Sequence, residues 1–363
     1  MKNIIKSLIV LASVVTFSSA NAGVLEVTGT AKATYNISGS ESSTAINEQG
    51  KSVGITNELA FTGTGELDNG YTWKYQVELD DNSSGATTSD DTRLELTTPY
   101  GAVAAYNTEG SLNTKYKFSA AAYGAGSDNG SSGGMTYGSS IDSYNNLQYH
   151  TPAGLLPYEI LAKVAYSPSS DKGKNSGNSG GAQDAAADGN NVTQYQLTAA
   201  PIEGLNLYAS YMTKSGELGT VQGYESGGLQ AKYAWNAFTV GYGESYLSNP
   251  ISTETTSATT TELNTAALLA AVKSFENDAF SIGFKVNDNL SLSYEEEDSQ
   301  ASKRTLAVTG NTKNDVTLSV NTIQAAYSMG GMTLSLSSKD IENQNYALGK
   351  DAKETLLVVA MSF

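Results

Sequence analysis

Apolar and polar residues alternate along most of the chain beyond residue 22, with a period of two. Tyr71, Trp73 and Tyr75, for example, share one phase, and Thr72 and Lys74 share the other. A period of two places successive side chains on opposite faces of a β-strand, whereas a helix repeats every 3.6 residues. The pattern therefore predicts strands that each have one apolar face and one polar face.

The alternation divides the chain into sixteen predicted strands, joined by short and long connections in turn. The predicted strands span residues 24–37, 51–66, 71–81, 90–98, 101–108, 142–151, 157–167, 191–200, 204–215, 223–235, 237–248, 271–286, 289–298, 314–329, 331–341 and 353–363. Connections such as 67–70 and 202–204 are tight, whereas 38–50 and 109–141 are long and polar. All six prolines fall in connections or at strand ends. Proline cannot donate a hydrogen bond to a strand ladder, so this placement supports the segmentation.

Strands with one apolar and one polar face can pack as a soluble sandwich or close into a barrel that meets lipid. The polar faces carry charges at mid-strand, namely Lys32, Glu58, Lys74, Arg93, Glu95 and Lys163. A watery lumen accepts such charges, and the alternating connections and even strand count also favour a barrel. Lipid cannot hydrogen-bond a free strand edge, so the sheet must close. We therefore expect an all-β fold, a transmembrane antiparallel β-barrel of 16 strands.

Two stretches depart from the regular pattern. In residues 314–329 the apolar phase changes near Asn321, because Val316 and Leu318 do not share the phase of Ile323 and Ala325. A bulge or an extension of the strand beyond the membrane would explain the change. Residues 263–272 have a helical pattern, which predicts a short helix in a loop.

Composition agrees with a wall between lipid and water. Apolar residues make up 39% of the 363 residues and charged residues 16%, both low for a soluble domain. The sequence has no Cys, which excludes a disulfide scaffold, and beyond residue 22 no apolar run is long enough for a spanning helix. A formal charge of −16 with only two arginines argues against nucleic acid as a partner.

The N-terminus predicts export. Lys2 and Lys6 precede the apolar run 8–17, and Ala20-Asn21-Ala22 forms a small-residue cleavage site. These are the three parts of a secretory signal peptide. We expect residues 1–22 to be removed and residues 23–363 to form the barrel. Without Lys2 and Lys6 the formal charge of −16 becomes −18.

The chain resembles the general, non-specific porins of Gram-negative bacteria, most closely the alphaproteobacterial type. The resemblance rests on the signal peptide, the opening strand 23–29, the long fifth connection, the stretch 324–334 and the last strand, which ends in Phe363. It implies an outer-membrane homotrimer of sixteen-stranded barrels with the third extracellular loop, 109–141, folded inwards. It also implies that the outer-membrane assembly machinery reads Phe363, that lipid surrounds the barrel, and that small hydrophilic solutes and ions diffuse through it.

The resemblance also indicates where selectivity arises, because such porins set basic wall residues against acids of the inward loop. The pore-lining and constriction candidates are Lys32, Glu58, Lys74, Arg93, Glu95, Glu109, Asp128 and Asp142. Only Arg93 is available for the usual arginine cluster, which weakens the case for anion preference. From the acidic excess we expect a weak cation preference. No cofactor and no metal site is expected.

Three alternatives stay open. An enzyme would need a general base, and the one histidine, His150, has no evident partner in the sequence. A secreted β-rich adhesin or surface-layer protein would explain export but not the alternating connections. A substrate-specific outer-membrane channel would carry aromatic residues through the lumen, for which Tyr208 alone is weak support. Acids in 171–190 and 295–298 could meet divalent ions, although a solvated surface explains them better.

Overall fold

The computed structural model of the chain describes residues 23–38, 51–81, 87–107, 110, 112–168, 191–215, 220–249, 251–252, 272–303 and 315–363. The predicted signal peptide, Glu109, the acidic stretch 171–190 and nearly all of the predicted loop helix lie outside these residues. The cleavage of residues 1–22 therefore stays a prediction.

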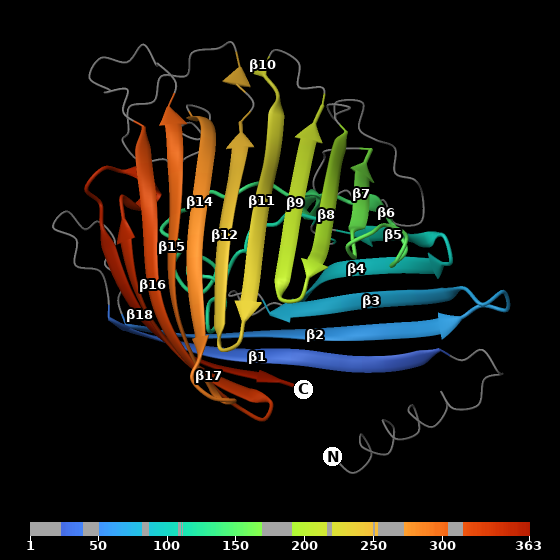
Figure 1. Ribbon diagram of the computed structural model, residues 1–363, viewed down its shortest axis with the longest axis horizontal. Coiled ribbons are helices and arrows are strands. Elements are labelled where there is room, and N and C mark those ends of the chain that lie inside the picture. The colour runs from blue at the N-terminus through green and yellow to red at the C-terminus, as the bar shows by residue number, and fades with distance from the viewer. Residues whose placement is uncertain are drawn as a thin grey trace.

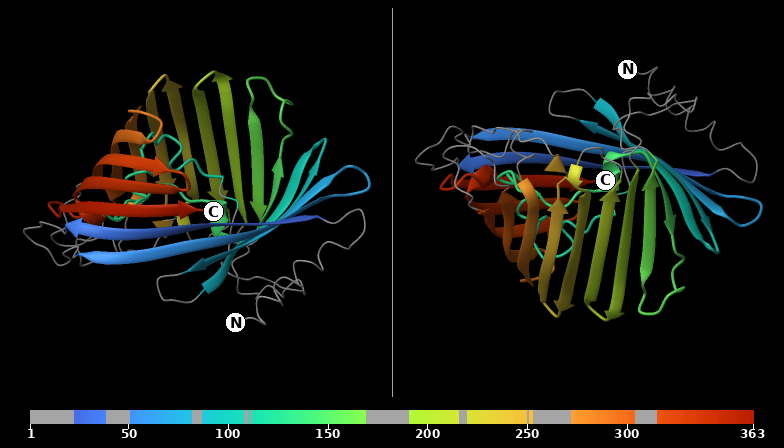
Figure 2. Two further views of the ribbon diagram at one scale, coloured as in Figure 1. Left: turned by 90° about the horizontal axis from the view of Figure 1, so that it is seen from below. Right: turned by 90° about the horizontal axis from the view of Figure 1, so that it is seen from above.

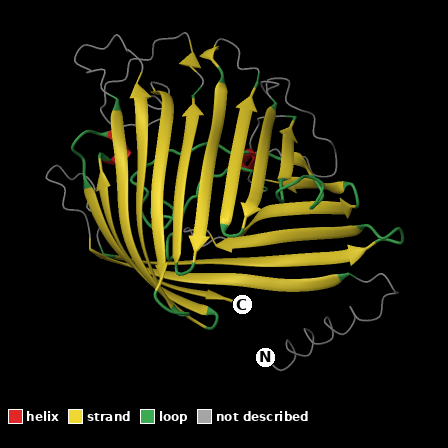
Figure 3. Ribbon diagram, viewed as in Figure 1, coloured by secondary structure: helices red, strands yellow, loops and turns green. Residues whose placement is uncertain are grey.

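Sixteen antiparallel strands pair side by side and close into a barrel (Figures 1 and 3). They are β1 Val24–Ser38, β2 Ser52–Glu66, β3 Thr72–Asp81, β4 Thr87–Thr98, β5 Gly101–Asn107, β6 Asn146–His150, β7 Leu161–Ser167, β8 Val192–Ile202, β9 Leu205–Lys214, β11 Tyr224–Trp235, β12 Phe238–Ser248, β14 Val272–Lys285, β15 Leu290–Lys303, β16 Val316–Met329, β17 Met332–Glu342 and β18 Ala352–Ser362. The first and last strands close the ring, with Ala31 opposite Met361. The predicted fold class is confirmed.

The remaining elements are small. Strands β10 Thr220–Gln222 and β13 Ile251–Ser252 form a separate two-stranded sheet. Single 3₁₀ turns, η2 Ile141–Ser143 and η3 Gln344–Tyr346, lie in connections. Among the described residues, no helix has the length and apolar character needed to cross a membrane.

Tight turns join the strands at one end of the barrel. Asn236, between β11 and β12, has φ 52°, and Gly204 and Gly330 have φ 79° and 60°. Glycine and asparagine tolerate this left-handed conformation, which short hairpin turns require. The connection between β6 and β7 differs: Tyr158 and Glu159 also have positive φ, so β7 begins at Leu161 rather than at the predicted residue 157.

The two faces of the strands meet different surroundings, as the alternation predicts. Outward-facing side chains are exposed and apolar, as for Val53 (74% exposed) and Leu229 (68%). Inward-facing side chains are polar, and Gln76 and Gln230 are buried inside the barrel. The fold thus presents an apolar surface to lipid and a polar surface to the lumen.

The phase change in β16 is not caused by a bulge. The register of β16 runs without interruption against both β15 and β17. Val316 and Leu318 lie on the lumen side, where a loop inside the barrel buries them. Ile323 lies on the opposite face and is 62% exposed. The strand stays regular, and the apolar face changes because lipid adjoins one part of it and protein covers the other.

Candidate functional site

Residues 112–145, between β5 and β6, run through the interior of the barrel, and we call them the inward loop. Figures 1 and 2 show its teal and green trace inside the ring of strands. Lumen-side groups from β8 to β18 hold it, beginning with Gln194 and ending with Glu354. The predicted inward folding of this connection is confirmed. The loop covers that part of the wall, so the lumen narrows to the space between the loop and strands β1–β7.

The first half of the inward loop is held by main-chain hydrogen bonds to side chains of the wall. The Phe118 N–H donates to Gln230 Oε1 (2.8 Å). The Ser281 hydroxyl donates to the Phe118 carbonyl (3.0 Å) and accepts from the Ala120 N–H (2.9 Å). These bonds replace the hydrogen bonds to water that the backbone of an exposed loop would form.

Glycines of the wall let the loop backbone come this close. A Cβ on Gly241 would lie 1.6 Å from the Phe118 carbonyl oxygen, and one on Gly283 would lie 2.4 Å from that of Ala120. Both glycines are on the lumen side of their strands, where any side chain would lift the loop from the wall. We call Gly241 and Gly283 the glycine seat.

The tip of the loop lies on two buried carboxylates of β15. Glu295 accepts from the Gly126 N–H (2.6 Å). Glu297 accepts from the Ser127 N–H (2.7 Å), the Ser127 hydroxyl (2.6 Å) and the Tyr137 hydroxyl. Strand alternation thus turns Glu295 and Glu297 inwards. Glu296 and Asp298 lie on the outer face, so the acidic run 295–298 does not act as one cluster.

A buried ion pair fixes the next residues of the loop. Lys339 Nζ lies 3.2 Å from Glu354 Oε2, and both side chains are at most 5% exposed. Lys339 also donates to the carbonyls of Asn129 (2.8 Å) and Ser131 (2.7 Å). Glu354 accepts from the Ser131 N–H (2.9 Å). Each charge therefore has hydrogen-bond partners that offset the free-energy cost of removing it from water.

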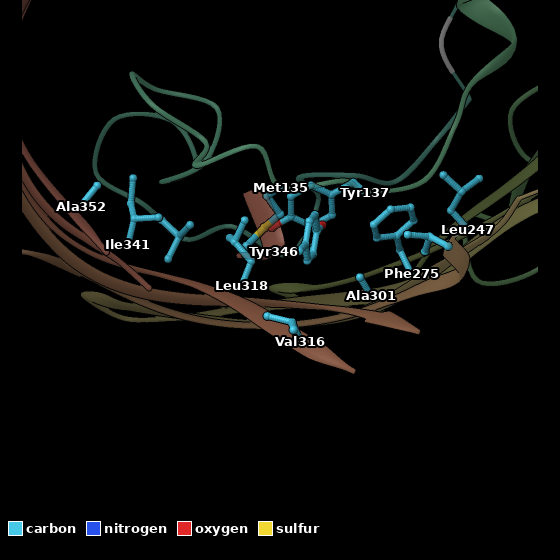
Figure 4. Close-up of a cluster of buried hydrophobic side chains, with 12 residues drawn as sticks. Met135, Tyr137, Leu247, Phe275, Ala301, Val316, Leu318, Ile341, Tyr346 and Ala352 are labelled. Atoms are coloured by element: carbon cyan, nitrogen blue, oxygen red, sulfur yellow. The ribbon is translucent and has the colours of Figure 1, made fainter. Parts of the chain in front are cut away.

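The returning half of the loop packs on apolar side chains that face the interior (Figure 4). Met135 and Tyr137 of the loop contact a buried cluster from β14 to β18 that includes Phe275, Leu318 and Ile341. The Tyr346 hydroxyl accepts from the Thr136 N–H (2.7 Å). This half of the loop has a core of its own.

Two of the predicted loop acids lie within electrostatic range of a lysine of the same loop. Lys115 lies over the ring of Tyr116, 4.5 Å from its centroid. Burial lowers the pKa of the Lys115 ammonium, and the carboxylates of Asp128, Glu297 and Asp142 oppose that shift. Asp128 and Asp142 therefore lie within electrostatic range of Lys115. The third predicted loop acid, Glu109, lies outside the described residues.

Of the predicted wall residues, Lys32, Glu58, Lys74, Arg93 and Glu95 all lie on the lumen side. Glu58 is paired in register with Asp80 of β3, and Lys32 is opposite Thr56. Glu58 and Asp80 lie eight or nine residues from the tight turn that joins β2 and β3, towards the end with the long connections.

A second charged group lies on the lumen side nearer the short turns. Lys74 is paired in register with Glu95, and the Arg93 guanidinium donates to Gln76. The wall therefore has the acids Glu58 and Asp80 towards one end. Lys74 and Arg93 lie towards the other end, where Glu26, Glu66 and Glu95 also face the lumen.

Two lumen lysines were not among the sequence candidates. Lys117 of the inward loop lies over the ring of Tyr208, 5.9 Å from its centroid. Lys232 of β11 donates to the Ser119 carbonyl (3.4 Å). Lys232 shares the phase of Gln230, so the alternation alone could have placed it in the lumen. Lys117 had no such signal, because its position depends on the path of the loop.

The one histidine lies on the lumen wall. His150 Nε2 is 2.8 Å from Gln148 Oε1, and no serine hydroxyl is recorded on its ring among the described residues. The same described part of the chain has no group of three or more His, Cys, Asp or Glu side chains that could hold a metal ion.

The chain resembles known porins in structure. It has a TM-score of 0.62 and 15% identity to Salmonella typhi OmpF in complex with daunomycin, covering 93% of this chain and 97% of that one. The TM-score to a loop-deletion mutant of OmpT, an outer membrane protein of Vibrio cholerae, is 0.60 at 13% identity. The match covers 94% of this chain and 100% of that one. The TM-score to a mutant of the Rh. blastica porin is 0.59 at 12% identity, and the match again covers 94% of this chain and 100% of that one.

No curated protein matches the chain in sequence. The model of one protein family, described as Gram-negative porin, matches residues 7–363, nearly the whole chain. Together with the closed barrel and its inward loop, this match identifies the protein: the chain belongs to the Gram-negative porin family.

Proposed function

We propose that the inward loop sets the width of a channel through which small hydrophilic solutes and ions diffuse passively. As a Gram-negative porin, the chain is an outer-membrane channel. The observation that supports the role of the loop is its fixation along one part of the wall, from Gln230 to Glu354. A fixed loop gives a lumen of constant bore, and bore and lining charge determine what passes.

Conductance of the purified protein tests this proposal. In planar bilayers we expect stepwise, long-lived conductance increases, and in liposomes we expect swelling rates that fall smoothly with the size of neutral sugars. Heat-denatured protein is the control. Closed bilayers would contradict the channel itself, and a sharp preference for one sugar among others of equal size would instead favour a substrate-specific channel.

The surroundings of the barrel are a second part of the proposal. We propose that it forms homotrimers and that the remaining outer surface contacts outer-membrane lipid. The exposed apolar side chains of β1 and β2, such as Val53 and Ile55, suit either a protein or a lipid neighbour. A hollow of about 820 Å³ on the outer wall beside Tyr195, Leu229 and Tyr242 is also lined by Glu244, Glu276 and Asp278, and these carboxylates suit a polar neighbour rather than lipid tails. Cross-linking in native membranes would reveal trimers.

The C-terminal residue is expected to matter for assembly. The Phe363 N–H donates to the Gly29 carbonyl (3.0 Å), and the Gly29 N–H donates to the Phe363 carbonyl (2.9 Å). Deleting Phe363 removes both bonds from the seam between β1 and β18, together with the proposed signal for the assembly machinery. We expect far less folded protein in the outer membrane, measured as the fraction with heat-modifiable electrophoretic mobility.

Phe363→Tyr is the matched control, because it keeps the main chain and an aromatic ring. Normal assembly of the deletion variant would refute the role of the residue. Normal assembly in vivo combined with slow refolding in detergent would assign it to closure of the barrel alone.

The expected weak cation preference stays a prediction, since it rests on net charge. We propose no enzymatic role: His150 is a lumen-wall residue bonded to Gln148. A hydrolytic activity lost in His150→Ala would reverse that assignment.

A further inference from the structure

The acidic excess of the chain does not lie along the narrow part of the lumen. One group of acids is on the outer face of the wall, namely Glu225, Glu244, Glu276, Asp278, Glu296 and Asp298, all but the last of them exposed. Their strand phase is that of outward residues such as Tyr242 and Phe280. Strand alternation therefore points these carboxylates away from the lumen, with the sheet between them and a passing ion.

A second group of acids lies beneath the inward loop. Glu295, Glu297 and Glu354 are at most 5% exposed, and their oxygens accept hydrogen bonds from the loop or pair with Lys339. A carboxylate with its bonds made inside protein adds little to the charge that a passing ion meets. The charges that remain in the open lumen therefore decide whether the channel prefers anions or cations.

Basic side chains cluster in one part of the lumen nearer the short turns, from β4 and β7 to the inward loop and β11. Lys163 of β7 lies within electrostatic range of Lys117, Arg93 and Glu95. Lys232 lies within range of Lys117. Lys74, opposite Glu95 in register, adds a fifth basic group. Glu26 and Glu66 also face the lumen nearer the short turns, on β1 and β2. We call Lys74, Arg93, Lys117, Lys163 and Lys232 the basic zone.

Three lysines of the basic zone have no counter-charge of their own. Lys117, Lys163 and Lys232 form no ion pair with another described residue, whereas Lys339 and Lys353 do. An ammonium group with no paired carboxylate keeps its attraction for a mobile anion. Walls of low dielectric around a narrow lumen focus that attraction.

The inward loop places one of these charges in the path of solutes. Lys117 is exposed, and the next residue is fixed to the wall through the Phe118 N–H and carbonyl. The basic zone therefore includes the loop itself, on the side where the resemblance had placed acids. Lys117 lies over Tyr208 of β9, two strands from Lys163 on β7, and Lys163 in turn is within electrostatic range of Arg93 on β4.

We propose that the basic zone is a binding and selection site for small anions, which makes the open channel anion-preferring despite the net charge of the chain. Its ligands are chloride, carboxylates and inorganic phosphate, held by direct charge contacts with the lysines. The inference rests on the channel function proposed above and gives its selectivity the sign opposite to that expected from net charge. Of the other lumen-side acids, Glu58, Glu78 and Asp80 lie farther from the short turns, and Glu26 and Glu66 lie on β1 and β2, away from β7 and β11.

Reversal potentials test whether the channel prefers anions or cations. The wild-type channel in a planar bilayer under a tenfold KCl gradient, at a mean of about 0.1 M where the Debye length is about 10 Å, should pass chloride more readily than potassium. Removing one unit charge about 10 Å from the ion path changes the permeability ratio about twofold. Lys163→Gln should therefore lower the ratio of chloride to potassium permeability. The triple variant K117Q/K163Q/K232Q should bring this ratio to one or below.

Matched controls separate this site from general effects of charge. Lys353→Gln removes a lysine that pairs with Asp340 on the outer face, and it should leave the ratio unchanged. Glu95→Gln should raise the chloride preference. As a second readout, replacing chloride by acetate should change wild-type conductance more than replacing potassium by lithium, and phosphate should reduce the chloride current.

The outcomes are distinguishable. Absence of any conductance would overturn the channel function rather than the site. Normal channels with cation preference, or a K163Q ratio equal to the wild-type ratio, would overturn the anion site while leaving the channel function intact. Heat-modifiable mobility of each variant confirms that it is folded before its ratio is compared.

Discussion

Replacing Gly241 with valine is expected to lift the inward loop off the wall and lower the single-channel conductance. The new Cβ would stand 1.6 Å from the Phe118 carbonyl oxygen, far inside contact distance. The loop backbone must then move towards the lumen and lose its bonds to Gln230 and Ser281. Overpacking of this kind costs about 1–3 kcal/mol, and each lost hydrogen bond about 1 kcal/mol.

Single-channel recording checks the conductance, and the midpoint of thermal unfolding checks the stability. We expect smaller conductance steps, noisier open-state current and a lower midpoint. Gly223→Ala is the control, because a Cβ there has no atom within 4 Å, and it should behave as wild type. Unchanged conductance in Gly241→Val would mean that the loop does not set the bore.

Replacing Lys339 with methionine is expected to be the most destabilising single substitution of those considered. It leaves the buried Glu354 carboxylate without its counter-charge and the Asn129 and Ser131 carbonyls without their donor. Breaking a buried pair from one side costs about 3–5 kcal/mol. The tip of the inward loop loses its anchor at the same time, so the open-state current should also become noisier.

The exposed pair Lys353–Asp340 supplies a matched comparison. Both of its side chains are more than half exposed, and surface pairs are worth about 0–1 kcal/mol. Lys353→Met should therefore hardly move the unfolding midpoint. The double variant K339M/E354Q should recover part of the loss, because the neutral amide removes the unpaired charge. Equal stability of K339M and K353M would refute the anchoring role of Lys339.

The alternation of apolar and polar residues predicts which wall side chains face the lumen, because each face of a strand adjoins either lipid or water. Alternation places Lys32, Lys74 and Arg93 on the lumen side with no knowledge of the partner strands, since a side-chain period of two leaves only two choices. The same rule placed Lys163 on a polar face and would have found Lys232. It fails at Val316 and Leu318, where protein rather than lipid or water covers the face.

The contacts of the inward loop could not be predicted in this way. The Tyr123 N–H donates to Gln324, 201 residues later in the sequence, and Lys339 reaches the Ser131 carbonyl across 208 residues. Nothing in the spacing of such residues links them. The glycine seat is visible in the sequence only as two glycines in the lumen phase.

The sequence by itself determined the barrel and the two faces of its wall, because periodicity and composition are local and lipid requires a closed sheet. The export signal stays a prediction from the sequence. Only the tertiary structure decided which charges meet a solute. Burial under the loop removes Glu295 and Glu297 from the lumen, strand alternation turns Glu296 and Asp298 outwards, and the path of the loop brings Lys117 in. Net charge is a sum over the chain, whereas selectivity depends on where each charge lies.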